Sequence, residues 1–241
     1  MKTLIKNGTV VTASDTYKAD VLIEDEKVLM IGSNLPAEGA DVIDAAGLLV
    51  MPGGIDPHTH LDMPFGGTTT ADDFYTGQRA AAFGGTTCHV DFALQQKGES
   101  LKHGVEMWQE KAEGNTVIDY GFHIAITDPN EASINEISKL NDIGVSSLKV
   151  FQAYKGAFMV DDTALYKAME KAKEADILLM THCENGDAIA LLTEKLVAEG
   201  KLDPGYHLDA HPREIEGEAT ARAIAISAVT GAKLYVVHMS C

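Results

Sequence analysis

The pattern of apolar and polar residues divides the chain near residue 50. Residues 1 to about 50 hold short stretches in which apolar and polar side chains alternate, interrupted by Asn7, Gly8 and Gly32. Alternation with a period of two predicts strands with one buried face. We therefore expect residues 1–50 to form an antiparallel portion of a small β-sandwich, with strands at residues 3–6, 9–12, 20–24 and 27–31.

From residue 47 onward, apolar strands alternate with longer helical stretches, a pattern typical of parallel βα units. Six such units predict an α/β fold, a (β/α)8 TIM-like barrel over residues 51–241. Closure needs eight strands, and the sequence stops directly after the sixth, so we expect the N-terminal part of a longer protein. The expected strands are about 48–58, 85–92, 117–126, 145–151, 177–182 and 233–239, and the expected helices are about 71–83, 100–113, 131–141, 162–175, 186–199 and 214–230.

Composition narrows the class of protein. The chain of 241 residues is 45% hydrophobic and carries a formal net charge of -17, which disfavours nucleic acid and anionic membranes as partners because the mean field repels both. The N-terminus lacks the apolar core of a signal peptide, and we expect a cytoplasmic protein. Three cysteines, Cys88, Cys183 and Cys241, have no disulfide-type spacing and are expected to be buried structural thiols.

The first candidate site is the pair His58 and His60. It follows the apolar run 47–51, which is interpreted as a buried strand. Side chains at positions i and i+2 of a strand share one face, so both rings can reach one metal ion. Neutral imidazole suits zinc and related metals. A His-x-His pair also occurs often by chance, so further ligands are needed to support the interpretation.

Three more candidates stand at predicted strand ends, where barrel enzymes build their sites: Lys149, His182 and His238. Each histidine alone has an ordinary structural interpretation, and Lys149 could pair with an acid inside the barrel. A desolvated, neutral Lys149 could instead react with CO2 to give a carbamate, an anionic ligand able to bridge two metals. Five ligand positions exceed the need of one tetrahedral zinc, which favours a two-metal site.

Six motifs stand out along the chain: PGGIDPHTHLDMPFGG (52–67), SLKVFQAYKG (147–156), THCENGD (181–187), DPGYH (203–207), EGEATARA (216–223) and AKLYVVHMSC (232–241). Together they give the whole chain a close resemblance to the hydantoinase/dihydropyrimidinase branch of the amidohydrolase superfamily. The resemblance implies that His58 and His60 bind the more buried of two divalent metal ions, expected to be zinc, and that His182 and His238 bind the second. It also implies that Lys149 bridges both as its CO2-derived carbamate.

The family's chemistry is the opening of the cyclic amide of hydantoins or dihydropyrimidines to N-carbamoyl amino acids, a step of pyrimidine catabolism, by a metal-bridging hydroxide. The resemblance implies that Tyr154 binds the developing oxyanion. The general base is an aspartate of the last barrel strand, which would lie beyond Cys241, so Asp56 and Asp62 are given supporting roles. Met63, Phe65, Phe151 and Phe158 are expected to form an apolar wall for the substrate, although aromatic residues at strand ends are often plain core.

Two alternatives remain open. An allantoinase-type cyclic amidohydrolase would share the metal site, and a collapsin response mediator protein, a non-catalytic adaptor, would share the fold without all the ligands. Dihydroorotases carry an arginine where Asp62 stands here, which disfavours an anionic substrate. The resemblance implies a homo-oligomer, a tetramer or a dimer. The remaining histidines are expected to be structural or exposed: His89, His103, His123, His207 and His211.

Overall fold

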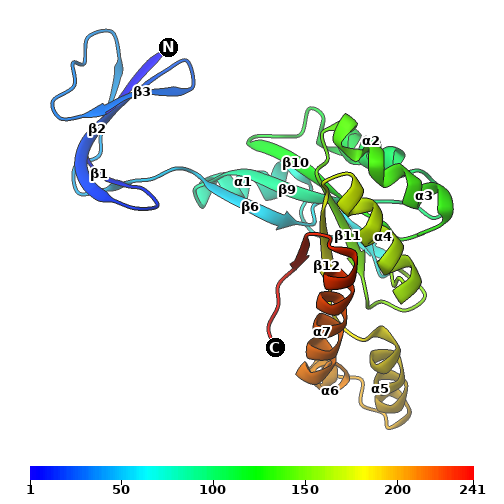
Figure 1. Ribbon diagram of the computed structural model, residues 1–241. Helices are drawn as coiled ribbons and strands as arrows, with labels where there is room; N and C mark the ends of the chain where they lie inside the picture. Colours follow the sequence, from blue (N-terminus) through cyan, green and yellow to red (C-terminus); the bar gives the residue numbers. More distant parts are fainter. The chain divides into compact units, whose positions relative to one another are not determined.

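The computed structural model describes residues 1–241 and divides into two compact units, Met1–Gly54 and Ile55–Cys241. Figure 1 shows the helices and strands of each unit, coloured along the sequence. None of the helices combines the length and the hydrophobicity that a membrane span requires.

The first unit is a five-stranded sheet in the order β3-β2-β1-β4, with β5 also paired to β1. Its core is small and contains Leu4, Leu22 and Leu35 on one face and Val10, Ala19 and Val21 on the other. The strands are β1 (Lys2–Val11), β2 (Thr16–Glu24), β3 (Lys27–Gly32), β4 (Asp41–Asp44) and β5 (Leu49–Val50).

Two expectations for this unit are wrong. Asn7 and Gly8 do not end a strand, because β1 continues through them with a register shift between Ile5 and Gly8. Asn7 adopts a left-handed φ of 63° there, so the turn-forming pair makes a bulge inside one strand. The sheet is also mixed, since β4 and β5 run parallel to β1.

The apolar run 47–51 is not a buried barrel strand. Leu49 and Val50 pair with β1 in the first unit, and Leu48, Leu49 and Met51 are 59%, 62% and 60% exposed. The strand that carries His58 is β6 (Gly54–Thr59), which begins several residues later than expected. A short apolar run predicts a strand but does not say which sheet the strand joins.

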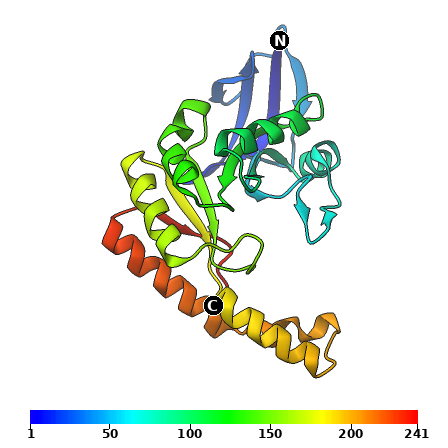
Figure 2. The same cartoon turned by 90° about the vertical axis from the view of Figure 1, so that its right-hand side faces the viewer.

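The second unit is built on a six-stranded sheet in the order β13-β12-β11-β10-β9-β6, and the pairs from β9 to β13 are all parallel. Figures 1 and 2 show helices α2, α3 and α4 along one side of this sheet and α5 with α6 projecting from one end of the unit. After β6 the strands are β9 (Thr86–Leu94), β10 (Asp119–Ala125), β11 (Ser147–Phe151), β12 (Leu178–His182) and β13 (Leu234–Val236), with a hairpin of β7 (Pro64–Phe65) and β8 (Thr68–Thr69).

Helices α1 to α5 each start at a side chain that accepts a hydrogen bond from the first turn, as the sequence favours. Asp161 caps α4 and Asn185 caps α5 in this way. The expected helix 131–141 is a short α-helix followed by a 3-10 turn that ends at Gly144, whose φ is 77°. The helices are α1 (Phe74–Phe83), α2 (Leu101–Ala112), α3 (Glu131–Glu136), η1 (Ile137–Ile143), α4 (Asp162–Glu174), α5 (Gly186–Ala198), η2 (Pro204–Tyr206), α6 (His207–Ala210) and α7 (Arg213–Thr230).

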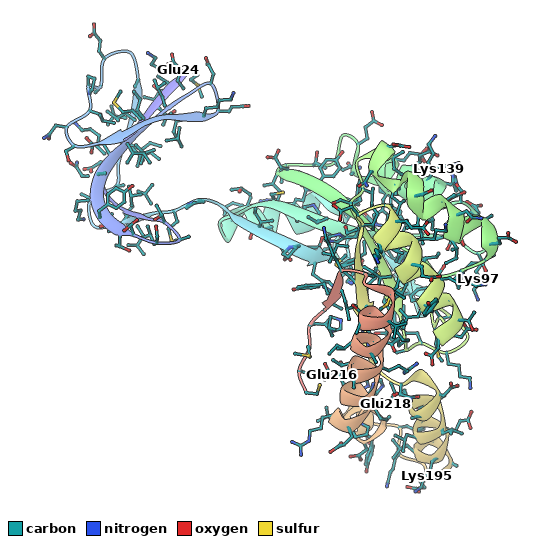
Figure 3. All side chains as sticks on the ribbon, in the orientation of Figure 1. Glu24, Lys97, Lys139, Lys195, Glu216 and Glu218 are labelled. Carbon is teal, nitrogen blue, oxygen red and sulfur yellow. The ribbon has the colours of Figure 1, made fainter.

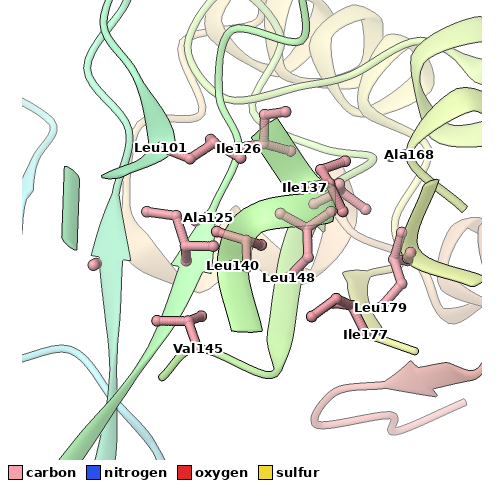
Figure 4. Close-up of a cluster of buried hydrophobic side chains, with 14 of the residues drawn as sticks. Leu101, Ala125, Ile126, Ile137, Leu140, Val145, Leu148, Ala168, Ile177 and Leu179 are labelled. Carbon is pink, nitrogen blue, oxygen red and sulfur yellow. The ribbon is translucent and has the colours of Figure 1, made fainter. Parts of the chain in front are cut away.

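The main core lies between the sheet and the helices that follow its strands. Figure 4 shows Leu148 and Leu179 of the sheet among Ile137, Leu140 and Ala168 of the covering helices. Every residue of β11 is buried, as expected for a parallel strand covered on both faces. Because side chains alternate along a strand, Lys149 points to the face opposite Leu148 and Val150.

The sheet is curled. The strands β6 and β13 stand at its opposite edges, yet the rings of His58 and His238 lie only 5.3 Å apart. This curl and the six strands in barrel order confirm the predicted barrel-type α/β fold.

Candidate metal centre

The curled sheet brings together the four histidines singled out in the sequence. His58 lies on β6 and His60 directly follows that strand, whereas His182 ends β12 and His238 follows β13. His58 Nε2 lies 3.2 Å from His60 Nε2, and His182 Nδ1 lies 3.2 Å from His238 Nε2. The site therefore consists of two imidazole pairs, which meet where the His58 and His238 rings face each other.

Lys149 reaches the same interior from β11 and has no acid partner. Its side chain is 1% exposed, and Nζ lies 4.8 Å from the ring centroids of both Phe92 and Phe151. Burial lowers the pKa of Lys149 from 10.5 to about 7, because the surroundings penalise the ammonium form. A fraction of the side chain is then the neutral amine at neutral pH.

Burial also keeps His58, His60 and His238 in their metal-binding form. Burial first, and then the charge of Lys149, lowers the pKa of His58 to about 3 and that of His60 to about 4. The pKa of His238 is lowered as well, chiefly by burial. Neutral imidazole is the form that ligates metals.

The spacing of the imidazole nitrogens suits two metal ions, each bound by one of the two histidine pairs. Two nitrogens that each lie about 2.0–2.1 Å from one tetrahedral zinc are themselves about 3.3 Å apart, close to the 3.2 Å in each pair. His60 Nδ1 is buried and has no hydrogen-bond partner. No three His, Cys, Asp or Glu side chains converge on one point, so a complete coordination sphere would need Lys149 and ligands of other kinds.

A buried polar network supports the strand that carries His58 and His60. The Thr59 hydroxyl, between them in sequence, donates to Asp91 Oδ2 over 2.7 Å. The same carboxylate accepts from the backbone N–H of Leu61 and, through Oδ1, from the indole N–H of Trp108. Asp91 is fully buried, and its three partners fix β6 to β9 and α2.

His89, one of the histidines expected from the sequence to be structural or exposed, belongs to this network. His89 Nδ1 lies 2.7 Å from the Thr59 hydroxyl, and His89 Nε2 lies 2.8 Å from Gln78 Nε2. Gln78 Oε1 accepts from the backbone N–H groups of Val117 and Ile118. Sequence reasoning missed the network, and its one visible signal is Asp91 within the apolar strand β9.

His123 performs a similar task on the other side of the site. Its Nε2 donates to the carbonyl of Pro57 over 2.9 Å, and its Nδ1 bonds to the Ser147 hydroxyl. His123 thereby joins the strand of His58 to the strand of Lys149 across the interior. Its ring also lies 4.7 Å from that of Phe92.

Glu184 supports the second histidine pair. Its carboxylate lies 2.6 Å from His182 Nε2 and 2.7 Å from His211 Nδ1. The hydrogen bond from His182, followed by that from His211, lowers the pKa of Glu184 to about 2. These residues and His238 line a cavity of ≈ 470 Å³.

Tyr154 lies beside His182 and among the aromatic residues that were predicted to contact the substrate. Its ring lies 5.1 Å from that of His182 and 5.4 Å from that of Phe65. Burial, followed by the charge of Glu184, raises the pKa of Tyr154, so its phenol stays a hydrogen-bond donor. Phe65, Tyr154 and Phe158 line an open hollow of ≈ 700 Å³.

The remaining predicted wall residues differ in their exposure. Phe151 is 6% exposed and Phe65 is 42% exposed, while Met63 is partly buried against the core. The rings of Phe151 and Phe158 lie 5.4 Å apart. Phe151 and Met63 therefore pack in the core, and neither is among the residues that line the hollow.

The carboxylates and thiols near the motifs have local contacts. Asp56 Oδ1 accepts from the backbone N–H of His58, and Asp62 Oδ2 accepts from that of Phe74. Cys183 is buried beside α7, but Cys88 is only partly buried and Cys241 is exposed. The expectation of three buried thiols is wrong for Cys88 and Cys241.

The profile of the amidohydrolase family matches residues 49–237. Over 242 residues the chain is 54% identical to D-hydantoinase of Geobacillus stearothermophilus, a match that covers 100% of this chain and 51% of that protein. It is 42% identical to dihydropyrimidinase of Rattus norvegicus, with 98% of this chain and 47% of that protein covered.

The crystal structure of dihydropyrimidinase from Brevibacillus agri NCHU1002 is similar throughout, with a TM-score of 0.98, 58% identity, and coverage of 100% of this chain and 52% of that one. The chain thus spans about half the length of the relatives that it matches.

Proposed function

The chain belongs to the amidohydrolase family, and we propose that the intact protein opens the ring of hydantoins or dihydropyrimidines to give N-carbamoyl amino acids. The similarity to D-hydantoinases and dihydropyrimidinases over the full length of the chain supports this substrate class. Asp62, held against α1, offers no cationic partner for a substrate carboxylate, which favours uncharged cyclic ureides.

The observation that carries the proposal is the arrangement of two imidazole pairs around a buried lysine without an acid partner. His58 and His60 would hold one divalent metal ion, and His182 and His238 would hold the second. Lys149, as its carbamate, would supply the anionic oxygens between the two pairs. When bound, such ions provide Lewis acidity and lower the pKa of water near neutrality.

The chain's own residues have separate tasks in this reaction. The Tyr154 phenol, kept protonated by burial, would donate a hydrogen bond to the carbonyl oxygen as negative charge develops on it. The rings of Phe65 and Phe158 would pack against the ring substituent and exclude water from that side. Asp91, through Thr59, would hold His58 and His60 in register.

The metal, the oligomeric state and the cellular location are proposed from the resemblance to the same family. We expect zinc as the metal, a homo-oligomer that is a tetramer or a dimer, and a cytoplasmic location. The net charge of -17 supports neither nucleic acid nor anionic membrane as a partner.

The test is turnover of hydantoin, dihydrouracil and allantoin by the full-length protein, before and after chelation and after zinc is restored. We expect hydantoin or dihydrouracil to be hydrolysed at about 1–10³ s⁻¹, with loss on chelation and recovery with zinc. A His60→Asn variant should stay inactive, whereas His103→Asn, on the exposed face of α2, should behave as wild type. Preference for allantoin would support an allantoinase, and no turnover by zinc-loaded protein would support the adaptor alternative.

A further inference from the structure

Glu184 connects two histidines that come from different segments. Oε2 accepts from His182 Nε2 over 2.6 Å, and Oε1 accepts from His211 Nδ1 over 2.7 Å. The three side chains are only 11%, 18% and 19% exposed. An ionised carboxylate is an acceptor only, so both of these ring nitrogens carry their proton.

The position of that proton decides what the rest of the His182 ring can do. With the proton on Nε2, a neutral ring has its lone pair on Nδ1. Nδ1 is the atom that lies 3.2 Å from His238 Nε2. The other tautomer would place a hydrogen atom between the two rings, where the second metal ion is proposed to bind.

We propose that Glu184 and His211 are positioning residues, which fix His182 in its Nε2–H tautomer and so present Nδ1 to the metal ion shared with His238. This inference rests on the proposed function, because it assigns residues to the metal site proposed there. Neither residue is assigned as a ligand, since both oxygens of Glu184 already accept hydrogen bonds from imidazoles.

His211 contributes by orienting the carboxylate. It follows α6, in the segment between α5 and α7, and its hydrogen bond fixes the plane in which Oε2 faces His182. The rings of His207 and His211 also stack, with centroids 4.1 Å apart. The helical segment that projects from the unit is thereby connected to the second histidine pair.

The test is zinc binding by the full-length Glu184→Gln variant, measured by competition with a chromogenic chelator. A carboxamide has one oxygen, so it cannot accept from both histidines, and its N–H₂ facing His182 Nε2 would select the wrong tautomer. We expect one of two zinc ions to bind about 10–100 times more weakly and the other to bind as in wild type. The matched control is Glu99→Gln, which alters a 2.7 Å contact with His103 on the exposed face of α2 and should change neither affinity.

Two variants at residue 211 provide a second test, which does not depend on the folding of Glu184→Gln. His211→Asn keeps an N–H donor near the position of Nδ1 and should retain most of the zinc affinity, whereas His211→Phe removes the donor and should weaken the same ion. Equal affinity of both ions in His211→Phe and wild type, with Glu184→Gln also unchanged, would overturn the proposal.

The tautomer itself is a second readout. Nitrogen-15 NMR of histidine-labelled, metal-free protein should show His182 as Nε2–H in wild type and a shift toward Nδ1–H in Glu184→Gln. If wild type bound no zinc, the proposed function would fail, and the tautomer spectrum would decide the positioning role alone. An Nδ1–H tautomer of His182 in wild type would contradict that role.

Discussion

The Nζ atom of Lys149 lies 4.8 Å from the centroid of the Phe92 ring, and no carboxylate lies near enough to pair with it. An aromatic face attracts an ammonium group only modestly, so it does not replace the lost hydration. Burial accordingly lowers the pKa of Lys149 to about 7. Lys149 therefore differs from a structural lysine, whose charge is balanced by a neighbouring acid.

Replacing Lys149 by methionine should stabilise the metal-free protein and abolish its metal binding. The change removes a buried ammonium group, so at pH 7 the free energy of unfolding should rise by about 1–3 kcal/mol. Urea unfolding of the full-length protein in chelator measures this, and elemental analysis measures the metal. Lys139→Met, on an exposed side chain labelled in Figure 3, should change neither; a less stable Lys149→Met variant that still binds two metals would contradict the account.

The Tyr154→Phe change removes one hydroxyl at the mouth of the site. If the phenol binds the developing oxyanion, kcat should fall by roughly 10²–10³ with metal content intact. Steady-state kinetics with the preferred substrate measures the effect. The control is Tyr166→Phe, on the surface of α4 at 37% exposure, and an unchanged kcat in Tyr154→Phe would remove Tyr154 from the mechanism.

Asp91 should make stability depend on pH. Burial raises its pKa from 3.8 to about 6, although its hydrogen bonds oppose the shift. Between pH 4 and pH 6 the folded state then holds a proton that the unfolded state has released, so the contribution of Asp91 to stability is present below about pH 4 and is lost as pH rises through 6.

The difference in unfolding free energy between wild type and Asp91→Asn should therefore fall by about 1–3 kcal/mol from pH 4 to pH 6 and stay level above that. Urea titrations in chelator at several pH values measure it. For the control Asp142→Asn, at an exposed position, the difference in unfolding free energy from wild type should stay constant with pH. If that difference rose with pH for Asp91→Asn, burial would not be raising the pKa of the Asp91 carboxyl group.

Gly186 allows α5 to begin close beside the end of β11. A Cβ atom there would lie 2.7 Å from Met159 Sδ, 3.0 Å from Ala153 Cα and 3.0 Å from the Gln152 carbonyl. Gly186→Ala should thus cost about 1–3 kcal/mol of stability through overpacking. Gly205→Ala, where a Cβ atom would meet nothing within 4 Å, should be nearly neutral in the same urea measurement, and equal stability of the two variants would refute the close approach.

The spacing of residues along strands made much of the arrangement predictable. The i and i+2 positions of His58 and His60 placed both rings on one face, and the alternation in β11 placed Lys149 away from the helices. Parallel strands end at the same side of the sheet, so the positions of His182 and His238 followed from the order of the units.

The supporting contacts were not predictable from local pattern. The bonds of Thr59 with Asp91 and of His123 with Pro57 join residues 32 and 66 positions apart, and such pairings leave no periodic signal in one sequence. The contact between His211 and Glu184 depends on the path of the segment between α5 and α7, which contains only short helical turns.

The most direct test of the two-metal account is a crystal structure of the zinc-loaded, full-length protein with anomalous data at the zinc edge. The account predicts two anomalous peaks per chain about 3.5–4 Å apart, one beside His58 and His60 and the other beside His182 and His238, with the density of a carbamate on Lys149 between them. A single peak, or an unmodified Lys149 directed at the Phe92 ring in fully loaded protein, would contradict it.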